Sequence, residues 1–154
     1  MGGIFSRVLG AGGRDTAGEQ TAFPVTRSEA DWKATLSPEQ FRVLRRHGTE
    51  RPFSHPLNEE KRDGTFRCAG CGTPLFDAQT KYDSGSGWPS FFRPLDGAVG
   101  TATDHVLAMP RTEVHCAQCG GHLGHVFEDG PAPTGLRYCM NGAALDFEPD
   151  AGRR

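Results

Sequence analysis

The five cysteines of this 154-residue chain constrain its fold more than any other feature. Four of them form two matching Cys-x-x-Cys-Gly motifs, Cys68/Cys71 and Cys116/Cys119. In each motif a short turn directs two thiolates towards one point, and the glycine that follows permits a tight backbone. Two such motifs predict a closed tetrahedral site with four sulfur ligands, which suits one Zn²⁺ ion. The fifth cysteine, Cys139, belongs to no pair.

The predicted zinc site is structural, because four cysteine ligands leave no open position for water. Its two halves lie far apart in the sequence, so the metal must join two distant hairpins. The alternative is two independent buried or redox-active pairs. A thioredoxin-like pair requires a strand followed by a helix, and neither motif has that context.

Charge and composition narrow the choice of partner and compartment. A formal net charge of −2 at pH 7 argues against nucleic acid as the main partner, because phosphate binding needs a basic surface. No apolar run is long enough to span a membrane. An odd number of cysteines, Cys-x-x-Cys motifs and no secretory signal indicate a reducing compartment, the cytoplasm. We expect a monomer.

One domain is predicted over residues 23–149, between flexible ends at 1–22 and 150–154. The first 22 residues are rich in glycine and show no hydrophobic periodicity. Residues 1–6 also fit an N-myristoylation pattern, but a plain disordered start is the simpler interpretation.

Frequent glycine and proline favour short strands and turns over a helical bundle. Short helices are expected only near the N-terminus, one at 28–32 and one from Pro38. Ser37 and Gln40 suit a capping box for the second helix, and Gly48 is predicted to end it. Strands are predicted at 65–68, 74–76, 98–103, 105–110, 112–115, 122–128, 137–141 and 144–147. Strands without long helices between them predict antiparallel sheets, folded as a sandwich or open barrel.

Cys139 is the candidate nucleophile, although a lone cysteine is more often a buried core thiol. Arg137 and Asn141 lie two positions to either side, so the three side chains share one face of the predicted strand. A face that carries arginine, cysteine and asparagine is not a core face. Arg137 is expected to favour the thiolate, and Asn141 to hydrogen-bond within the site.

Two histidines that precede Cys139, His122 and His125, can donate or accept a proton near neutral pH. The remaining histidines are expected at surface or structural positions; they are His47, His55, His105 and His115. A loop at 82–92 combines glycines, serines and aromatic residues. Its Trp88 is either a core anchor or an apolar wall for a substrate group.

From about residue 23 to residue 149, the chain resembles the B-type peptide methionine sulfoxide reductases. The matching motifs are both cysteine pairs, Gly-Trp-Pro-Ser-Phe at 87–91, His-Leu-Gly-His-Val-Phe at 122–127 and Arg-Tyr-Cys-Met-Asn at 137–141. The resemblance implies two antiparallel sheets with short N-terminal helices. It also implies thiol-dependent reduction of the R epimer of methionine sulfoxide, preferably in peptides or proteins, as repair of oxidative damage.

Carried onto this sequence, the resemblance makes Cys139 the nucleophile, which attacks the sulfoxide sulfur and is left as sulfenic acid. It places Trp88 against the methyl group of the substrate and Arg137 near the thiolate, with Phe127 also in the substrate-binding set. The polar part of the site is formed by His122, His125 and Asn141.

The sequence departs from the family pattern at one position. Many members carry a resolving cysteine between the two glycines that precede the tryptophan, where this chain has Ser86. With four cysteines committed to metal, no thiol remains in the chain to form a disulfide with Cys139. The expected reductant is therefore external, either thioredoxin or glutathione with glutaredoxin.

Two other classes of protein compete with this interpretation. A zinc-stabilised binding module without chemistry has no use for a thiol between Arg137 and Asn141. A zinc-ribbon nucleic-acid binder is disfavoured by the balance of charge, despite the basic cluster of Arg42, Arg45 and Arg46.

Overall fold

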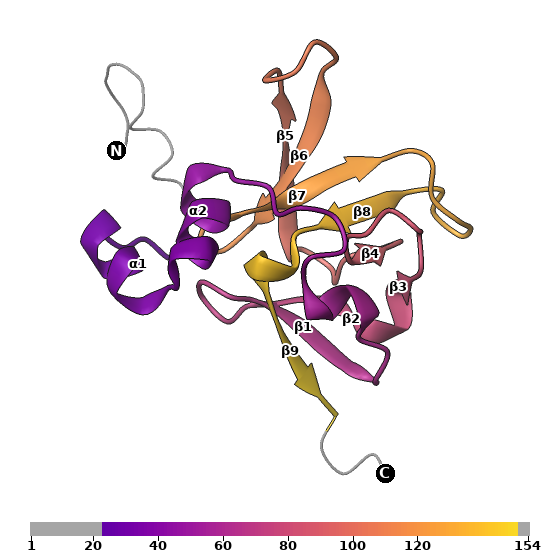
Figure 1. Ribbon diagram of the computed structural model, residues 1–154, viewed down its shortest axis with the longest axis horizontal. Helices are drawn as coiled ribbons and strands as arrows, with labels where there is room; N and C mark the ends of the chain where they lie inside the picture. Colours follow the sequence, from indigo (N-terminus) through magenta and orange to yellow (C-terminus); the bar gives the residue numbers. More distant parts are fainter. Residues whose placement is uncertain (1–22, 151–154) are drawn as a thin grey trace.

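The computed structural model describes residues 23–150, which fold into two short helices followed by nine short strands (Figure 1). The helices are α1 (Glu29–Thr35) and α2 (Pro38–Arg46). The strands are β1 (Gly64–Cys68), β2 (Pro74–Asp77), β3 (Lys81–Tyr82), β4 (Ser90–Phe91), β5 (Val99–Asp104), β6 (Arg111–Cys116), β7 (His122–Phe127), β8 (Arg137–Met140) and β9 (Leu145–Pro149). Flexible ends were predicted at 1–22 and 150–154, and all of these residues except Asp150 lie outside the described residues.

The strands form two antiparallel sheets, which confirms the predicted fold class. The smaller sheet has three strands in the order β2–β1–β9, and the larger has six in the order β3–β4–β8–β7–β6–β5. Neighbouring strands pair antiparallel throughout, and β8 lies between β4 and β7. This order places the segment 137–140 inside the larger sheet, where both neighbours fix its position.

Aromatic side chains join the two sheets. Phe66 of β1, Phe76 of β2 and Phe91 of β4 are fully buried. Phe91 stacks on Phe76 with ring centroids 4.2 Å apart and meets the edge of Phe66 at 5.0 Å. Burying one such side chain stabilises the fold by about 2–3 kcal/mol. The core therefore lies where the smaller sheet meets the inner strands of the larger one.

The predicted capping box of α2 is confirmed, but the predicted end of the helix is off by one residue. The Ser37 side chain accepts from the N–H of Gln40, and the Gln40 side chain accepts from the N–H of Ser37. The helix ends at Arg46, and His47 takes the left-handed cap conformation with φ 57°. Glycine usually fills this position because it has no Cβ, so the sequence pointed to the neighbouring Gly48.

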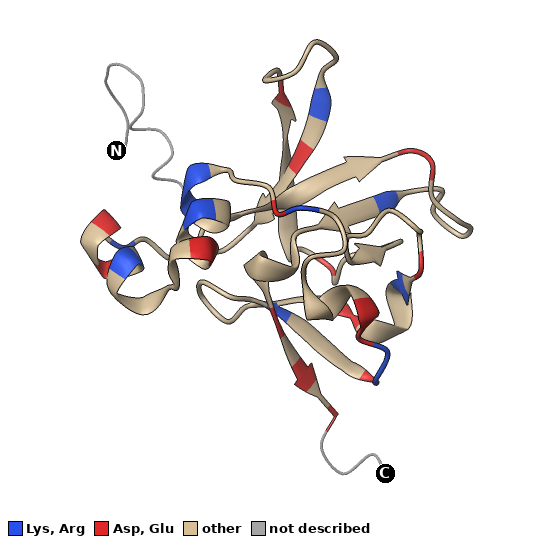
Figure 2. Cartoon of the chain, in the orientation of Figure 1, with Lys and Arg blue, Asp and Glu red and all other residues tan. Residues whose placement is uncertain are grey.

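Two of the three arginines in the basic cluster of α2 pair with nearby acids, and the third, Arg45, donates to the carbonyl of Cys119. Figure 2 shows lysine and arginine interspersed with aspartate and glutamate along the ribbon. Arg42 pairs with Glu39 at 2.9 Å, and Arg46 pairs with Glu29 of α1. These contacts give the arginines a role in holding the helices, without any need for a phosphate partner.

The predicted strand at 105–110 is wrong, and two short strands were missed. Residues 105–110 form the turn between β5 and β6, whose apolar side chains Val106, Leu107 and Met109 are exposed. Their hydrophobicity is typical of a buried strand and led to the wrong prediction, although no sheet covers these side chains. The strands β3 and β4 have two residues each, too few to produce an alternating pattern. Over residues 23–150, the helices are too short and too polar to cross a bilayer.

Candidate functional site

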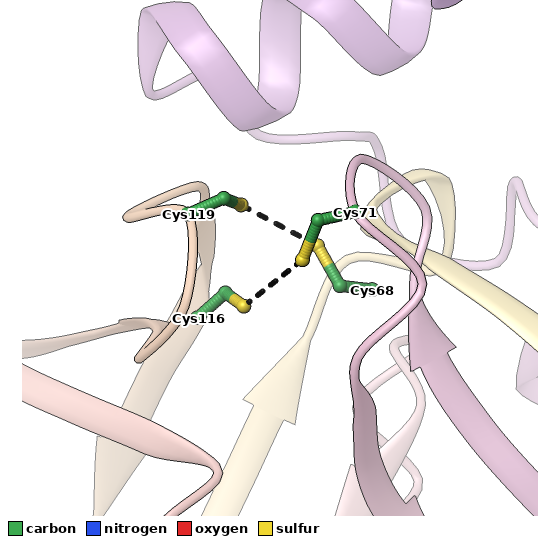
Figure 3. Close-up of side chains that lie close together, drawn as sticks. All are labelled: Cys68, Cys71, Cys116 and Cys119. Carbon is green, nitrogen blue, oxygen red and sulfur yellow. Dashed lines mark hydrogen bonds between the residues drawn. The ribbon is translucent and has the colours of Figure 1, made fainter. Parts of the chain in front are cut away.

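The two cysteine motifs meet at one place, although they come from different sheets (Figure 3). Cys68 ends β1 and Cys71 lies in the turn to β2, whereas Cys116 ends β6 and Cys119 lies in the turn to β7. The Sγ atoms of Cys68 and Cys119 are 3.8 Å apart, and those of Cys71 and Cys116 are 3.6 Å apart. A tetrahedral zinc ion with Zn–S bonds of about 2.3 Å places its sulfurs about 3.8 Å apart. The donor set and its spacing therefore fit a metal ion.

Backbone N–H groups support the sulfur atoms of this cluster. Gly70 donates to Cys68 Sγ and Gly121 donates to Cys119 Sγ, each at 3.4 Å. Such donors stabilise thiolate charge. The five cysteines of the chain all have free Sγ atoms, so no disulfide competes with a metal here.

A cavity of about 180 Å³ surrounds Cys139 on the larger sheet. It is lined by Thr49, Trp88, Arg111, Gly124, His125, Phe127, Arg137, Cys139 and Asn141. The predicted strand face of arginine, cysteine and asparagine thus opens into one space, together with Trp88 and His125. Of the residues selected from the sequence for this site, only His122 does not line the cavity.

Cys139 sits at the centre of the larger sheet, opposite Ser90 of β4 and His125 of β7. Burial raises the pKa of the Cys139 thiol above its ordinary value of 9.0, although Arg137 and Ser86 act in the opposite direction. Arg137 is only partly effective because Asp129 binds its guanidinium in a bidentate pair at 2.9 and 3.1 Å. Arg137 does lower the pKa of Cys139, as expected, but burial raises it by more. The thiol is therefore protonated at neutral pH.

We expect alkylation of Cys139 by iodoacetamide to rise with pH through a midpoint above 9.0, because only the thiolate reacts. Arg137→Ala should move the midpoint up, and Asp129→Ala should move it down by freeing the guanidinium. Mass spectrometry of the Cys139 peptide across a pH series measures each midpoint. A midpoint near pH 7 in the unmutated protein, or no opposite shift in the two variants, would contradict this account.

His125 is oriented by an aspartate that sequence analysis missed. Its Nε2 lies 2.8 Å from Asp104 Oδ2, and Arg111 also contacts that carboxylate at 3.3 Å. Asp104 and Arg111 face each other where β5 ends and β6 begins. Burial holds the pKa of His125 below its ordinary 6.5, although the bond to Asp104 opposes this. His125 is therefore a neutral imidazole at pH 7, with one nitrogen fixed by Asp104.

His122 lies behind His125 and is almost completely enclosed, with 2% exposure. Its Nδ1 is 2.8 Å from Glu113 Oε2, and its ring meets the edge of His125 at 5.4 Å between centroids. The other face stacks on His47 at 4.9 Å. His122 therefore reaches the cavity only through His125.

Asn141 uses both polar atoms of its side chain to hold the backbone. Its Oδ1 accepts from the N–H of Glu50 at 2.9 Å, and its Nδ2 donates to the carbonyl of Leu123 at 3.0 Å. Asn141 is 3% exposed. It therefore fixes the floor of the cavity by joining β7, the end of β8 and the loop that follows α2.

Glu50 is the second residue that sequence analysis missed. Its buried carboxylate accepts from the N–H groups of Gly142 and Ala143 at 2.8 and 2.9 Å. Its carbonyl accepts from Trp88 Nε1 at 3.0 Å, which fixes the indole at the cavity wall. Nothing in the loop sequence around residue 50 distinguishes this glutamate from a solvent-exposed one.

Ser86 lies beside Cys139 and belongs to a chain of three hydroxyl groups. It contributes a side-chain hydrogen bond that lowers the pKa of Cys139 against the effect of burial. Its Oγ is 2.8 Å from Ser84 Oγ, which is 2.7 Å from Ser90 Oγ. A side chain at position 86 is therefore directed towards the candidate nucleophile.

Comparison with known proteins finds a family and close relatives. The model of the SelR domain matches residues 36–149. "Peptide methionine sulfoxide reductase MsrB" of Agrobacterium fabrum is 55% identical over 130 residues, which cover 84% of this chain and 96% of the relative. The protein of the same name from Leptospira interrogans is 54% identical over 129 residues, 83% of this chain and 98% of the relative. The protein of the same name from Pseudomonas putida (strain W619) is 58% identical over 123 residues, which cover 79% of this chain and 92% of the relative.

Proposed function

The chain belongs to the SelR domain family, and from this premise we propose that it reduces methionine R-sulfoxide in peptides and proteins to methionine. It is a peptide methionine sulfoxide reductase whose role is repair of oxidative damage. The observation that carries the assignment of the site is the cavity in which Cys139 lies with His125, Arg137 and Trp88.

The reaction transfers one oxygen atom to Cys139. The sulfur of Cys139 attacks the sulfoxide sulfur, and the sulfoxide oxygen is protonated. The sulfur–oxygen bond of the substrate then breaks, and a sulfur–oxygen bond forms at Cys139. The substrate is reduced by two electrons to the thioether, and the thiol is oxidised to sulfenic acid. Because the resting thiol is protonated, it carries the proton that the oxygen requires.

The walls of the cavity divide the remaining tasks between apolar and polar groups. Trp88 and Phe127 offer apolar surface to the methyl group and the side chain of the substrate. His125 can pass a proton between Cys139 and the sulfoxide oxygen, since Asp104 fixes its ring. Arg137 stabilises negative charge as it develops on the sulfur. Asn141 and His122 act as positioning residues. Asn141 holds the backbone at the floor of the cavity, and His122 packs behind the ring of His125.

The proposal includes one zinc ion held by Cys68, Cys71, Cys116 and Cys119. When bound, the ion supplies a structural link and no chemistry, because four sulfur ligands leave no open position. The link joins the β1–β2 turn of the smaller sheet to the β6–β7 turn of the larger one. We also propose that residues 23–149 form the catalytic domain and that the protein acts as a monomer.

Regeneration of the enzyme is proposed to depend on an external thiol. Ser86 stands where many family members have a resolving cysteine, and it is directed towards Cys139. The four other cysteines form their own cluster. The sulfenic acid is then reduced by thioredoxin or by glutathione with glutaredoxin. The odd number of cysteines and their Cys-x-x-Cys spacing support a reducing compartment, the cytoplasm.

A single turnover without reductant tests the proposed function. Methionine R-sulfoxide should yield about one methionine per chain and a sulfenic acid on Cys139, because no internal thiol can follow. A sulfenic-acid trap and intact-mass measurement should show one adduct and no loss of two hydrogens. The S epimer should give no product. Equal use of both epimers, or no methionine from either, would exclude the proposed activity.

Ser86→Cys provides the matched control for that experiment. The introduced thiol should convert the sulfenic acid to a disulfide with Cys139, if the two sulfurs reach bonding geometry. The adduct should then disappear, and the mass should fall by two hydrogens relative to the reduced variant. A disulfide in the unmutated protein would show that one of the four clustered cysteines resolves the intermediate.

A further inference from the structure

Three serine hydroxyl groups form a continuous hydrogen-bonded chain beside Cys139. Ser90 on β4 lies directly opposite Cys139 on β8, so both side chains point to the same face of the larger sheet. Ser90 is fully buried, and its Oγ is 2.7 Å from Ser84 Oγ. Ser84 Oγ is 2.8 Å from Ser86 Oγ, and Ser86 hydrogen-bonds to Cys139. Both ends of the chain therefore lie next to the candidate nucleophile.

The backbone of the loop holds these hydroxyl groups in place. The N–H of Ser86 donates to Ser84 Oγ at 3.2 Å, and the N–H of Trp88 donates to Ser86 Oγ at 3.4 Å. Gly87 takes φ 93°, and a Cβ there would lie 2.7 Å from the ring of Phe53. The N–H of Phe53 also donates to the carbonyl of Gly87 at 2.7 Å. These contacts fix the direction in which the side chain at position 86 points.

The far end of the chain determines which way its hydrogens point. Ser90 donates to the carbonyl of Trp88 at 3.0 Å, and a carbonyl cannot donate in return. Each hydroxyl has a single hydrogen, so Ser84 must donate to Ser90, and Ser86 must donate to Ser84. No hydrogen of the Ser86 hydroxyl is left for the sulfur. In the resting protein, the S–H of Cys139 therefore donates to Ser86.

Loss of the thiol proton reverses the chain. A thiolate can only accept, so Ser86 turns its hydrogen towards the sulfur. Ser84 can then donate to Ser86, and Ser90 can donate to Ser84, because the same distance between two oxygens serves either direction. Only the bond from Ser90 to the carbonyl of Trp88 is lost. A hydrogen bond to a charged acceptor is roughly twice as strong as a neutral one, so the reversed chain stabilises the thiolate.

We propose that Ser86 is a catalytic residue in the reduction of methionine R-sulfoxide, whose hydroxyl accepts from the resting thiol and donates to the sulfur as the proton leaves. This role rests on the proposed function of the site. Ser84 and Ser90 act through Ser86, as positioning residues that set the direction of its hydroxyl. The thiol proton goes to the sulfoxide oxygen, and each serine keeps its own hydrogen.

A hydroxyl group suits a sulfur that changes its charge during the reaction. Burial raises the pKa of the Cys139 thiol, and Arg137 and then Ser86 act against this effect. Asp129 binds the guanidinium of Arg137 at 2.9 and 3.1 Å, which limits what the arginine contributes. A guanidinium only donates, so it favours the thiolate alone. The Ser86 hydroxyl is a partner for both the thiol and the thiolate.

The pH dependence of Cys139 alkylation tests the direction of the chain in the full-length protein without any substrate. Ser86→Ala should raise the midpoint, because the thiolate loses its donor. Ser84→Ala should lower it, because Ser84 is the acceptor that keeps the Ser86 hydrogen turned away from the sulfur in the resting state. Thr101→Ala removes an exposed hydroxyl on β5 and should leave the midpoint unchanged. Iodoacetamide and mass spectrometry of the Cys139 peptide give each midpoint, whether or not the protein reduces methionine sulfoxide.

Single-turnover formation of methionine without reductant separates a catalytic role from a structural one. At saturating methionine R-sulfoxide, Ser86→Ala should lower the rate constant by ~10- to 100-fold, the loss expected for one hydrogen bond to a charged group. The substrate concentration for half-maximal rate should change little, because Ser86 contacts the nucleophile. Ser86→Thr keeps the hydroxyl and should restore most of the rate. Three results would overturn the proposal. They are midpoints that shift in the same direction or not at all, an unchanged rate in Ser86→Ala, or an equal loss in Ser86→Ala and Ser86→Thr.

Discussion

Replacing Cys139 by serine is expected to abolish reduction of methionine sulfoxide, lowering kcat/KM by at least ~10⁴-fold. Cys139 lines the cavity and lies outside the four-cysteine cluster. A serine hydroxyl is a far weaker nucleophile at neutral pH, and it cannot accept the oxygen atom that a thiol takes up as sulfenic acid. The loss should therefore affect chemistry rather than folding.

Steady-state turnover of methionine R-sulfoxide with dithiothreitol measures this loss. The circular dichroism spectrum and the metal content of Cys139→Ser should match those of the unmutated protein. A variant that retains substantial activity would show that another sulfur performs the attack. Loss of metal in the same variant would show that the assignment of the other four cysteines is incomplete.

Replacing Cys116 by serine is expected to remove the metal and to lower the free energy of unfolding by at least ~4 kcal/mol. Structural zinc contributes on the order of 10 kcal/mol to the folding of small domains. Cys116 is fully buried at the end of β6, and its sulfur lies 3.6 Å from that of Cys71 in the other sheet. Without one ligand the link between the sheets opens and leaves unpaired thiolates in the interior.

Chemical denaturation combined with metal analysis tests this expectation, and Cys139→Ser provides the matched control. Both variants exchange one sulfur for oxygen, but only one lies in the cluster. The Cys116→Ser protein should contain little zinc and unfold at lower denaturant concentration, whereas the control should do neither. A metal-free Cys116→Ser protein with unchanged stability would exclude a structural role for the metal.

The features that could be predicted from the sequence are those with short-range causes. The cysteine motifs, the capping box from Ser37 to Gln40 and the shared face of Arg137, Cys139 and Asn141 each depend on residues a few positions apart. Local geometry determines them, so spacing alone reveals them. The two-sheet class followed in the same way from many short strands without long helices between them.

What the sequence did not reveal depends on contacts between distant residues. Asp104 reaches His125 across 21 positions, and Glu50 reaches Gly142 across 92. The residues next to Asp104 or Glu50 in the sequence give no indication of its distant partner. The apolar turn at 105–110 misled for the opposite reason, because its hydrophobic side chains are exposed and no long-range contact covers them. Burial is a property of the whole fold.

The position of β9 has a consequence for the order of events during synthesis. This strand, Leu145–Pro149, pairs along the full length of β1, whose residues leave the ribosome about 80 positions earlier. Until β9 has emerged, β1 keeps an unpaired edge beside the buried Phe66 and Cys68. Such an edge invites pairing with other chains. Both cysteine motifs are complete by residue 119. A metal ion can therefore bind and join the two hairpins of the growing chain before β9 has been synthesised.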